Sequence, residues 1–268
     1  MIMQRKLLAV AVLLAAAPLV QAQDSDALAK QLANPIASLT SVPLQFNYDH
    51  GFGSDGDGYK FVLNVQPVIP VSISDDWNMI SRTILPIANQ DGLIPGEGSQ
   101  FGLGDTVQSL FFSPKAPTDS GWVWGIGPVF LLPTATDEFL GGEKWGAGPT
   151  GVALKQTPTG WTYGVLFNHI WSFAGDEARN DINATFLQPF IAKSLGKGRT
   201  VNVAIESTYD WETDQWTAPI NFTYSKVSRI GKQLVSYAGG VRYYLEAGDT
   251  GPEWGARFTI TLLYPKKQ

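Results

Sequence analysis

The sequence lacks cysteine entirely and has only two histidines among its 268 residues. Without cysteine the chain can form neither disulfides nor thiolate metal sites, and it has no cysteine nucleophile. Charged residues are also scarce, at 16% against about 25% in an average soluble domain. A net charge of −5 gives no basic footprint for nucleic acid. We therefore predict no catalytic residue, no cofactor, no metal site and no nucleic-acid partner.

Long apolar runs are missing too, with one exception at the start of the chain. Residues 7–20 are almost wholly apolar, follow Arg5 and Lys6, and end before a cleavage-like Val20-Gln21-Ala22. This pattern is typical of a secretory signal peptide, and the run is shorter than the ~20 apolar residues that a membrane-spanning helix needs. We expect residues 1–22 to be removed on export, and we expect no helical span in the rest.

Residues 39–268 show a different pattern, in which apolar and polar residues alternate with a period of two. One face of the segment 216–226, for example, carries Ile220, Phe222 and Tyr224, while the other face is small and polar. Such alternation is typical of β-strands, and segments of about 10–13 residues tilted near 40° cross the ~25 Å apolar band of an outer membrane. The predicted strands are 39–48, 58–70, 76–87, 102–113, 121–132, 145–156, 160–172, 182–193, 199–210, 216–226, 234–245 and 253–264.

The connections between these segments alternate in charge. One set, with the C-terminal tail, is basic, with Asp75, Asp76 and Asp119 as its acids; its cations are Lys115, Lys155, Lys193, Lys197, Arg199, Lys226, Arg229, Lys232, Lys266 and Lys267. The other set is acidic, with seventeen carboxylates from Asp49 to Glu253 against Lys144 and Arg179. A soluble β-sandwich predicts polar loops without such alternation. Two rims of different charge, together with tryptophans near the segment ends, predict an all-β fold, a transmembrane antiparallel up-and-down barrel of about twelve strands.

An even number of strands places both ends of the chain on one side, which in bacterial outer membranes is the periplasm. The short basic turns then face the periplasm, and the acidic connections, several of them longer, face outward. Residues 23–38 precede the barrel and carry spaced apolar residues interrupted by Pro35. We expect a short helical or irregular segment there, which either plugs the lumen or lies in the periplasm.

Several segments in the predicted barrel have the order and composition of a known family. They are Leu32 to Leu39 running into Pro43 to Tyr48, Gly102 to Asp105, Gly125 to Pro128, Trp145 to Gly151, Asn168 to Phe173 with Gly175, and Leu187 to Phe190. In these segments the chain resembles the outer-membrane family catalogued as the "MetA-pathway of phenol degradation" family of transporters. The resemblance implies an outer-membrane barrel that admits small aromatic or apolar compounds. It supplies no catalytic residues.

Three local motifs have alternative interpretations. Residues 146–151 fit the dinucleotide fingerprint G-x-G-x-x-G, which requires a helix to begin at the motif. Pro149 and the strand-like flanking residues argue against that helix. The favoured interpretation is that these glycines make room in the wall of the barrel. Residues 54–58 resemble the start of a calcium loop without its remaining ligands. His169 and Ser172 do not make a hydrolase pair, because residues three apart on a strand face opposite sides.

Six charges lie within the predicted strands away from their ends: Lys60, Arg82, Asp105, Glu206, Arg242 and Arg257. A lipid-facing Arg or Lys costs about 2–4 kcal/mol at mid-membrane, so these residues are expected to point inward. The candidate lumen-lining residues are Lys60, Arg82, Asn168, Glu206, Arg242 and Arg257. They form either a structural network, with arginines paired to Glu206 or Asp105, or a constriction that selects solutes.

The sequence therefore favours an outer-membrane channel for passive passage of small molecules. A closed structural or surface-interaction barrel is the alternative, and an outer-membrane lipid-modifying enzyme is a weaker one. The expected partners are outer-membrane lipid, lipopolysaccharide and a small-molecule solute. The identity of the solute and the oligomeric state stay open.

Overall fold

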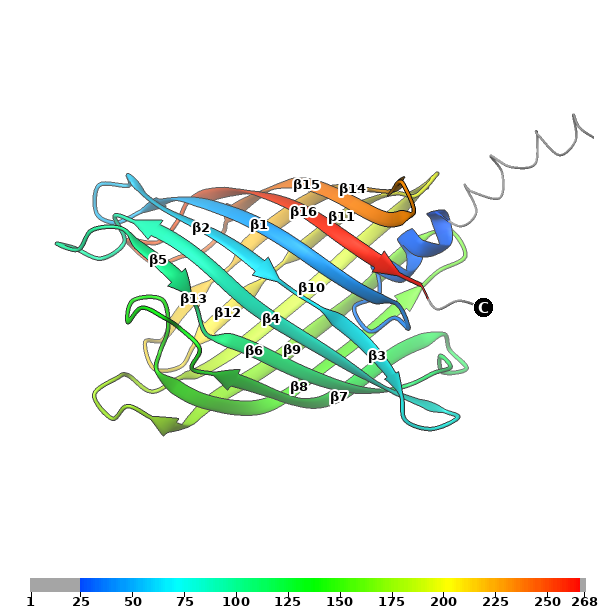
Figure 1. The fold of residues 1–268 in the computed structure, drawn as a ribbon, viewed down its shortest axis with the longest axis horizontal. Helices are drawn as coiled ribbons and strands as arrows, with labels where there is room; N and C mark the ends of the chain where they lie inside the picture. The colour runs from blue at the N-terminus through cyan, green and yellow to red at the C-terminus, as the bar shows by residue number, and fades with distance from the viewer. Residues whose placement is uncertain (1–24, 266–268) are drawn as a thin grey trace, which may run out of the picture.

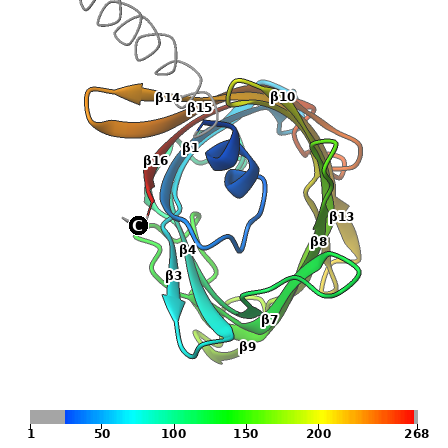
Figure 2. The same ribbon diagram turned by 90° about the vertical axis from the view of Figure 1, so that its right-hand side faces the viewer.

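The structure, a computed structural model, describes residues 25–265. The predicted signal peptide and the tail cations Lys266 and Lys267 lie outside the described residues. The described chain forms a closed antiparallel barrel of twelve strands (Figure 1, Figure 2). The predicted fold class is thereby confirmed.

Four of the barrel strands are interrupted, so that the sheet contains sixteen segments. Interruptions fall at residues 66–67, at 104–105, at Glu206 and at Ala218. The bounds of the segments are β1 (Thr40–Phe52), β2 (Gly58–Val65), β3 (Val68–Ser72), β4 (Trp77–Asp91), β5 (Gln100–Leu103), β6 (Thr106–Pro114), β7 (Trp122–Leu132), β8 (Lys144–Gln156), β9 (Trp161–Gly175), β10 (Asn183–Gly196), β11 (Arg199–Ile205), β12 (Ser207–Asp210), β13 (Gln215–Thr217), β14 (Pro219–Ile230), β15 (Gln233–Tyr244) and β16 (Trp254–Tyr264).

Each strand pairs with its neighbours in the sequence, and the first and last strands close the ring. β1 and β16 are antiparallel along their whole length, from Thr40 opposite Tyr264 to His50 opposite Trp254. No edge is left unpaired in the described barrel, because closure gives every backbone group in the wall a partner. β1 runs four residues beyond its predicted end, which brings Asp49 and His50 into the strand.

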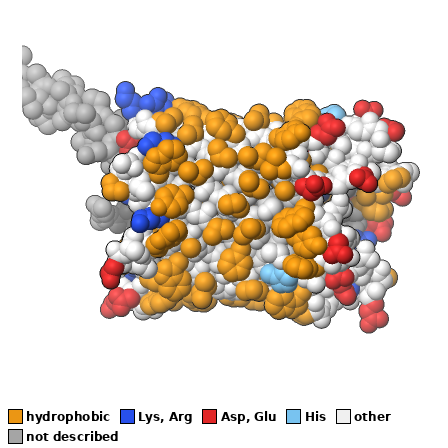
Figure 3. All heavy atoms as spheres, turned by 180° about the vertical axis from the view of Figure 1, so that it is seen from behind, with side chains coloured by type: hydrophobic (Ala, Val, Ile, Leu, Met, Phe, Trp, Pro, Cys, Tyr) orange, Lys and Arg blue, Asp and Glu red, His pale blue; other side chains and the backbone are white. Residues whose placement is uncertain are grey.

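The two faces of the wall differ in the way that a lipid environment requires. Phe222, Val241 and Tyr243 are more than half exposed on the outside, whereas the inward-facing Asn221 is 1% exposed. Figure 3 shows the resulting belt of hydrophobic side chains across one face of the barrel, with Lys and Arg gathered at one end and most Asp and Glu at the other. We call these the basic end and the acidic end.

Both ends of the described chain lie at the basic end, where a short helix of residues 25–32 sits inside the barrel (Figure 2). Within residues 25–265, no helix has both the length and the apolar character needed to cross a bilayer.

Candidate functional site

The N-terminal segment, residues 25–39, occupies the lumen at the basic end, and we call it the plug. Its helix begins with Ser25 and Asp26, residue types that favour a helix N-terminus, and ends before Pro35. The helix presents Leu28 and Ala29 on one face, and these pack with Leu39 against Val227 and Leu263 of the wall. The spaced apolar residues of the sequence thus fill the lumen instead of lying in the periplasm.

Ile36 anchors the extended part of the plug. It inserts among Ile80, Phe111 and Leu154, all at most 1% exposed, on the opposite wall. A Cβ added at Gly125 would lie 3.2 Å from Cδ1 of Ile36. Gly125 therefore makes room for a side chain entering the lumen, which is the role predicted for the wall glycines.

Polar contacts fix the plug to three further parts of the wall. The Gly198 N–H donates to the Asp26 carboxylate at 2.6 Å. The Gln156 side chain donates to the Lys30 carbonyl at 2.7 Å, and the Asn78 side chain donates to Oγ of Ser38 at 2.9 Å. Apart from the backbone that joins it to β1, the plug is held by packing and hydrogen bonds and by no disulfide, since the chain has no cysteine.

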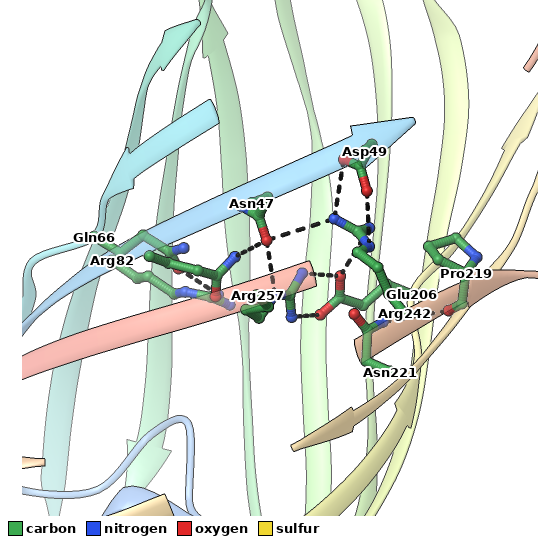
Figure 4. Close-up of polar contacts among 10 residues, drawn as sticks. Asn47, Asp49, Gln66, Arg82, Glu206, Pro219, Asn221, Arg242 and Arg257 are labelled. Atoms are coloured by element: carbon green, nitrogen blue, oxygen red, sulfur yellow. Dashed lines mark hydrogen bonds and ion pairs between the residues drawn. The ribbon is translucent and has the colours of Figure 1, made fainter. Parts of the chain in front are cut away.

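A cluster of ion pairs crosses the lumen on the acidic side of the plug (Figure 4). Arg257 on β16 makes a two-point contact with Glu206, with N–O distances of 2.7 and 2.8 Å, and its Nε donates to Asn47 Oδ1 at 2.7 Å. Glu206 occupies the interruption between β11 and β12, and β11 is separated from β16 by β14 and β15 in the strand order. The fork geometry of the guanidinium matches the carboxylate, so this contact fixes the orientation of both groups.

Arg242 extends the cluster toward the acidic end. Its Nη1 donates to Asp49 Oδ2 at 3.3 Å, and its Nη2 lies 3.8 Å from Glu206 Oε2. Nε of Arg242 and Oδ1 of Asp49 are 3.3 Å apart but do not have hydrogen-bond alignment, so this contact is ionic. The Arg242 and Asp49 side chains are about one-tenth exposed, and we call Asp49, Glu206, Arg242 and Arg257 the ion-pair cluster.

Two more cations face the lumen on either side of this cluster. Arg82 on β4 donates from Nη2 to the neutral Gln66 side chain at 3.1 Å. Lys60 on β2 is opposite Asp49 in register, yet within residues 25–265 its ammonium makes no hydrogen bond or ion pair. Both cations are outside the ion-pair cluster.

The lumen contains a cavity on each side of the cluster. The outer chamber, of about 520 Å³, opens toward the acidic end and is lined by Asp49, Lys60, Arg242 and Tyr244 together with Phe52, Val62, Leu93 and Ile94. The inner chamber, of about 320 Å³, lies between the plug and the wall, and Gln66 and Arg82 line it along with Leu32, Pro35, Val68, Leu166 and Phe190. Both volumes are in the range of small-molecule sites.

The structure brings together five of the six predicted lumen residues around these chambers: Lys60, Arg82, Glu206, Arg242 and Arg257. Asn168 lies apart on β9, opposite Thr150 and Phe186, and lines neither chamber. Lumen arginines were expected to pair with Glu206 or Asp105, and they pair with Glu206 and not with Asp105. Asp105 falls at the interruption between β5 and β6, where its carboxylate accepts the backbone N–H groups of Ala135 and Gly142 at 3.1 and 2.7 Å.

Asp49 is the member of the ion-pair cluster that the sequence did not predict, because it was counted among the acidic connections. It shares the inward face of β1 with Asn47, and the two-residue period links them. Extending the predicted strand beyond residue 48 would have found it.

The remaining motifs have structural partners. Nδ1 of His169 is 2.8 Å from the Thr185 hydroxyl, whereas the Ser172 hydroxyl donates to Asp181 at 3.0 Å, so the two side chains do not bind each other. Residues 146–151 lie within β8, and a Cβ at Gly148 would collide with the carbonyl oxygen of His169. Within residues 25–265, no group of three or more His, Asp or Glu side chains is placed to hold a metal ion.

No protein-family model matches the chain, and no curated protein matches it. Among solved structures it is similar to an outer-membrane channel from Pseudomonas putida F1, with a TM-score of 0.67, 12% identity, and coverage of 85% of this chain and 96% of that one. It also aligns with the KdgM porin, at a TM-score of 0.45 and 10% identity over 85% of this chain and 99% of that one. The first likeness shows that the fold is that of an outer-membrane β-barrel.

Proposed function

We propose that this protein is an outer-membrane channel through which small molecules diffuse passively. The observation that carries the proposal is the pair of lumen chambers, which lie on either side of one layer of side chains and next to a plug held by non-covalent contacts. Movement of a few side chains and of the plug would connect the chambers. The fold likeness to an outer-membrane channel supports the same function and location.

The solutes are small molecules with an apolar part. Leucine, valine, isoleucine, phenylalanine and proline side chains contribute to the chambers, interspersed with at least as many polar side chains. A mixed lining of this kind suits small organic molecules that have both an apolar and a polar part. It agrees with the aromatic or apolar compounds implied by the resemblance to the phenol-degradation family, and we propose membership of that family on the same grounds.

No enzymatic activity is proposed. The His169 and Ser172 side chains have different partners, and the chambers contain charged groups engaged with each other instead of a nucleophile with its base. The belt of hydrophobic side chains and the acidic connections would contact outer-membrane lipid and lipopolysaccharide.

Single-channel recording in planar bilayers tests the proposal. The refolded protein without residues 1–22 should give discrete openings of small conductance, and a variant lacking residues 23–38 should give larger ones. Arg242→Ala should alter ion selectivity, because it removes a cation from the layer between the chambers. Silence of both the full-length mature protein and the plug-deleted variant, with the barrel folded, would contradict a channel and favour a closed structural barrel.

A further inference from the structure

The charges of the central lumen do not balance. Four cations, Lys60, Arg82, Arg242 and Arg257, face the lumen here, against the carboxylates Asp49 and Glu206 of the ion-pair cluster and the loop carboxylate Asp249, which also lines the outer chamber. Both carboxylates of the cluster are held by its arginines. Lys60 and Arg82, one in each chamber, are the two of these cations that form no ion pair within residues 25–265.

Lys60 provides a free ammonium in the outer chamber. Its nearest acid along the register is Asp49, whose two oxygens are already engaged by Arg242. An ammonium carries three donors, and none of them has a hydrogen-bond partner within residues 25–265. The outer chamber thus offers the three donors of a cation that forms no ion pair to whatever enters it.

Arg82 is the corresponding cation without a carboxylate partner in the inner chamber. Its one hydrogen bond goes to the neutral side chain of Gln66 at 3.1 Å, which orients the guanidinium without neutralising it. No described carboxylate lies within ion-pair distance of Arg82. None of the other guanidinium nitrogens of Arg82 is a fully buried atom that lacks a hydrogen-bond partner. The residue lines the inner chamber. A guanidinium with free donors is well suited to bind a carboxylate.

Apolar side chains surround each of these cations. Phe52, Val62 and Ile94 line the chamber that holds Lys60, and Val68, Leu166 and Phe190 line the one that holds Arg82. A strongly hydrated inorganic anion would gain little from such walls. A small organic anion would use both features, because its charged group meets the cation and its body displaces water from the apolar lining.

We propose that Lys60 and Arg82 are two successive binding points for the charged group of a small amphipathic carboxylate. The proposal deepens the proposed function, since it names the substrate class of the same lumen. The ion-pair cluster separates the two points, so the anion passes from an ammonium to a guanidinium as it moves from the acidic end toward the plug. Binding at two weak sites in series favours passage over retention.

Equilibrium binding tests the site without requiring conduction. Isothermal titration of the folded protein in a non-ionic detergent would compare hexanoate with hexanamide, which has the same apolar body and no charge. Hexanoate should bind about tenfold more tightly, as expected for one charge-assisted contact. Lys60→Gln and Arg82→Gln should each weaken hexanoate several-fold and leave hexanamide unchanged, whereas Lys226→Gln, on the outer face of β14, should change neither.

Reversal potentials in a KCl gradient supply the second readout. The wild-type pore should prefer chloride, despite the acidic connections, and the double variant Lys60→Gln with Arg82→Gln should shift toward potassium.

Equal binding of hexanoate and hexanamide, or hexanoate binding that survives both substitutions, would overturn the anion site while leaving a conducting channel intact. Selective hexanoate binding in a folded but silent barrel would instead overturn the channel and retain the site. Lys60→Arg, which keeps the charge, should keep the binding.

Discussion

Arg257 and Glu206 join two strands that are far apart in the sequence, with both guanidinium nitrogens Nη1 and Nη2 on the carboxylate at 2.7 and 2.8 Å. The pair lies in the lumen with side chains 11% and 18% exposed. Taking two charges out of water is unfavourable, so the pair is not by itself a source of stability. Its effect is to fix the layer that separates the two chambers.

Removing one member of this pair should destabilise the barrel more than removing both. Glu206→Gln leaves Arg257 without its carboxylate partner, while Arg242 keeps only Asp49, and we expect a loss of about 3–5 kcal/mol in the free energy of unfolding. The double variant Glu206→Gln with Arg257→Met should recover part of that loss. Urea unfolding in lipid vesicles measures both, and a double variant as unstable as the sum of the single ones would contradict the pairing.

The plug should loosen when its anchor is truncated. Ile36→Ala removes a side chain from the cluster of Ile80, Phe111 and Leu154, and buried truncations of this kind cost about 2–5 kcal/mol. Because the ring of strands closes by pairing that does not involve the plug, we expect the loosened plug to give larger and noisier conductance in planar bilayers. Ile126→Ala, at a residue 57% exposed on the outer face, is the matched control and should leave the conductance as it is.

A charged side chain placed on the outward face of β14 should destabilise the barrel. Phe222→Arg puts a cation into the apolar belt, where the penalty is about 2–4 kcal/mol at the membrane midplane and less toward the interfaces. Thr223→Arg, one residue on, points into the inner chamber and should be better tolerated. Folding yield into vesicles and urea midpoints would be compared, and equal penalties at the two positions would argue against the assigned faces.

Asp181 should titrate below the usual range for aspartate. It lies in the connection between β9 and β10. A hydrogen bond donated by the Lys144 ammonium lowers the pKa of its carboxyl group most, and a hydrogen bond donated by the Ser172 hydroxyl lowers it further. The lowered pKa means that the contact stabilises the folded loop above the ordinary aspartate pKa, and that this contribution is lost as the pH falls through the folded value. Carboxyl ¹³C NMR would follow the titration.

Lys144→Met is the informative variant for that titration. The pKa of Asp181 should rise toward its ordinary value, and Ser172→Ala should raise it less. The Asp181 side chain is 70% exposed, so the global stability should change little in either variant. A pKa unmoved by Lys144→Met would show that the contact does not persist in solution.

Much of the wall could be predicted from the sequence because its environment is regular. Lipid outside and a polar lumen inside impose a period of two on every strand, and Phe222 and Asn221 obey it. The interruption at residues 66–67 escaped prediction, and the poor alternation of residues 102–113 did not show which way Asp105 would face, since a bulge changes which face a residue occupies without changing local composition. Asp105 was consequently given a lumen partner, whereas it organises a loop.

The sequence by itself determined the class of fold, the strand number and the inward direction of most of the charged strand residues, since each follows from short-range periodicity and from the penalty for charge in lipid. Only the tertiary structure decided which charges meet. Asp49 and Arg242 are separated by most of the chain and come together through barrel closure, and Lys60 and Arg82 remain without carboxylate partners because each carboxylate can satisfy only its nearest cations. The position of the plug was decided in the same way, by the fit of Ile36 into the space that Gly125 leaves.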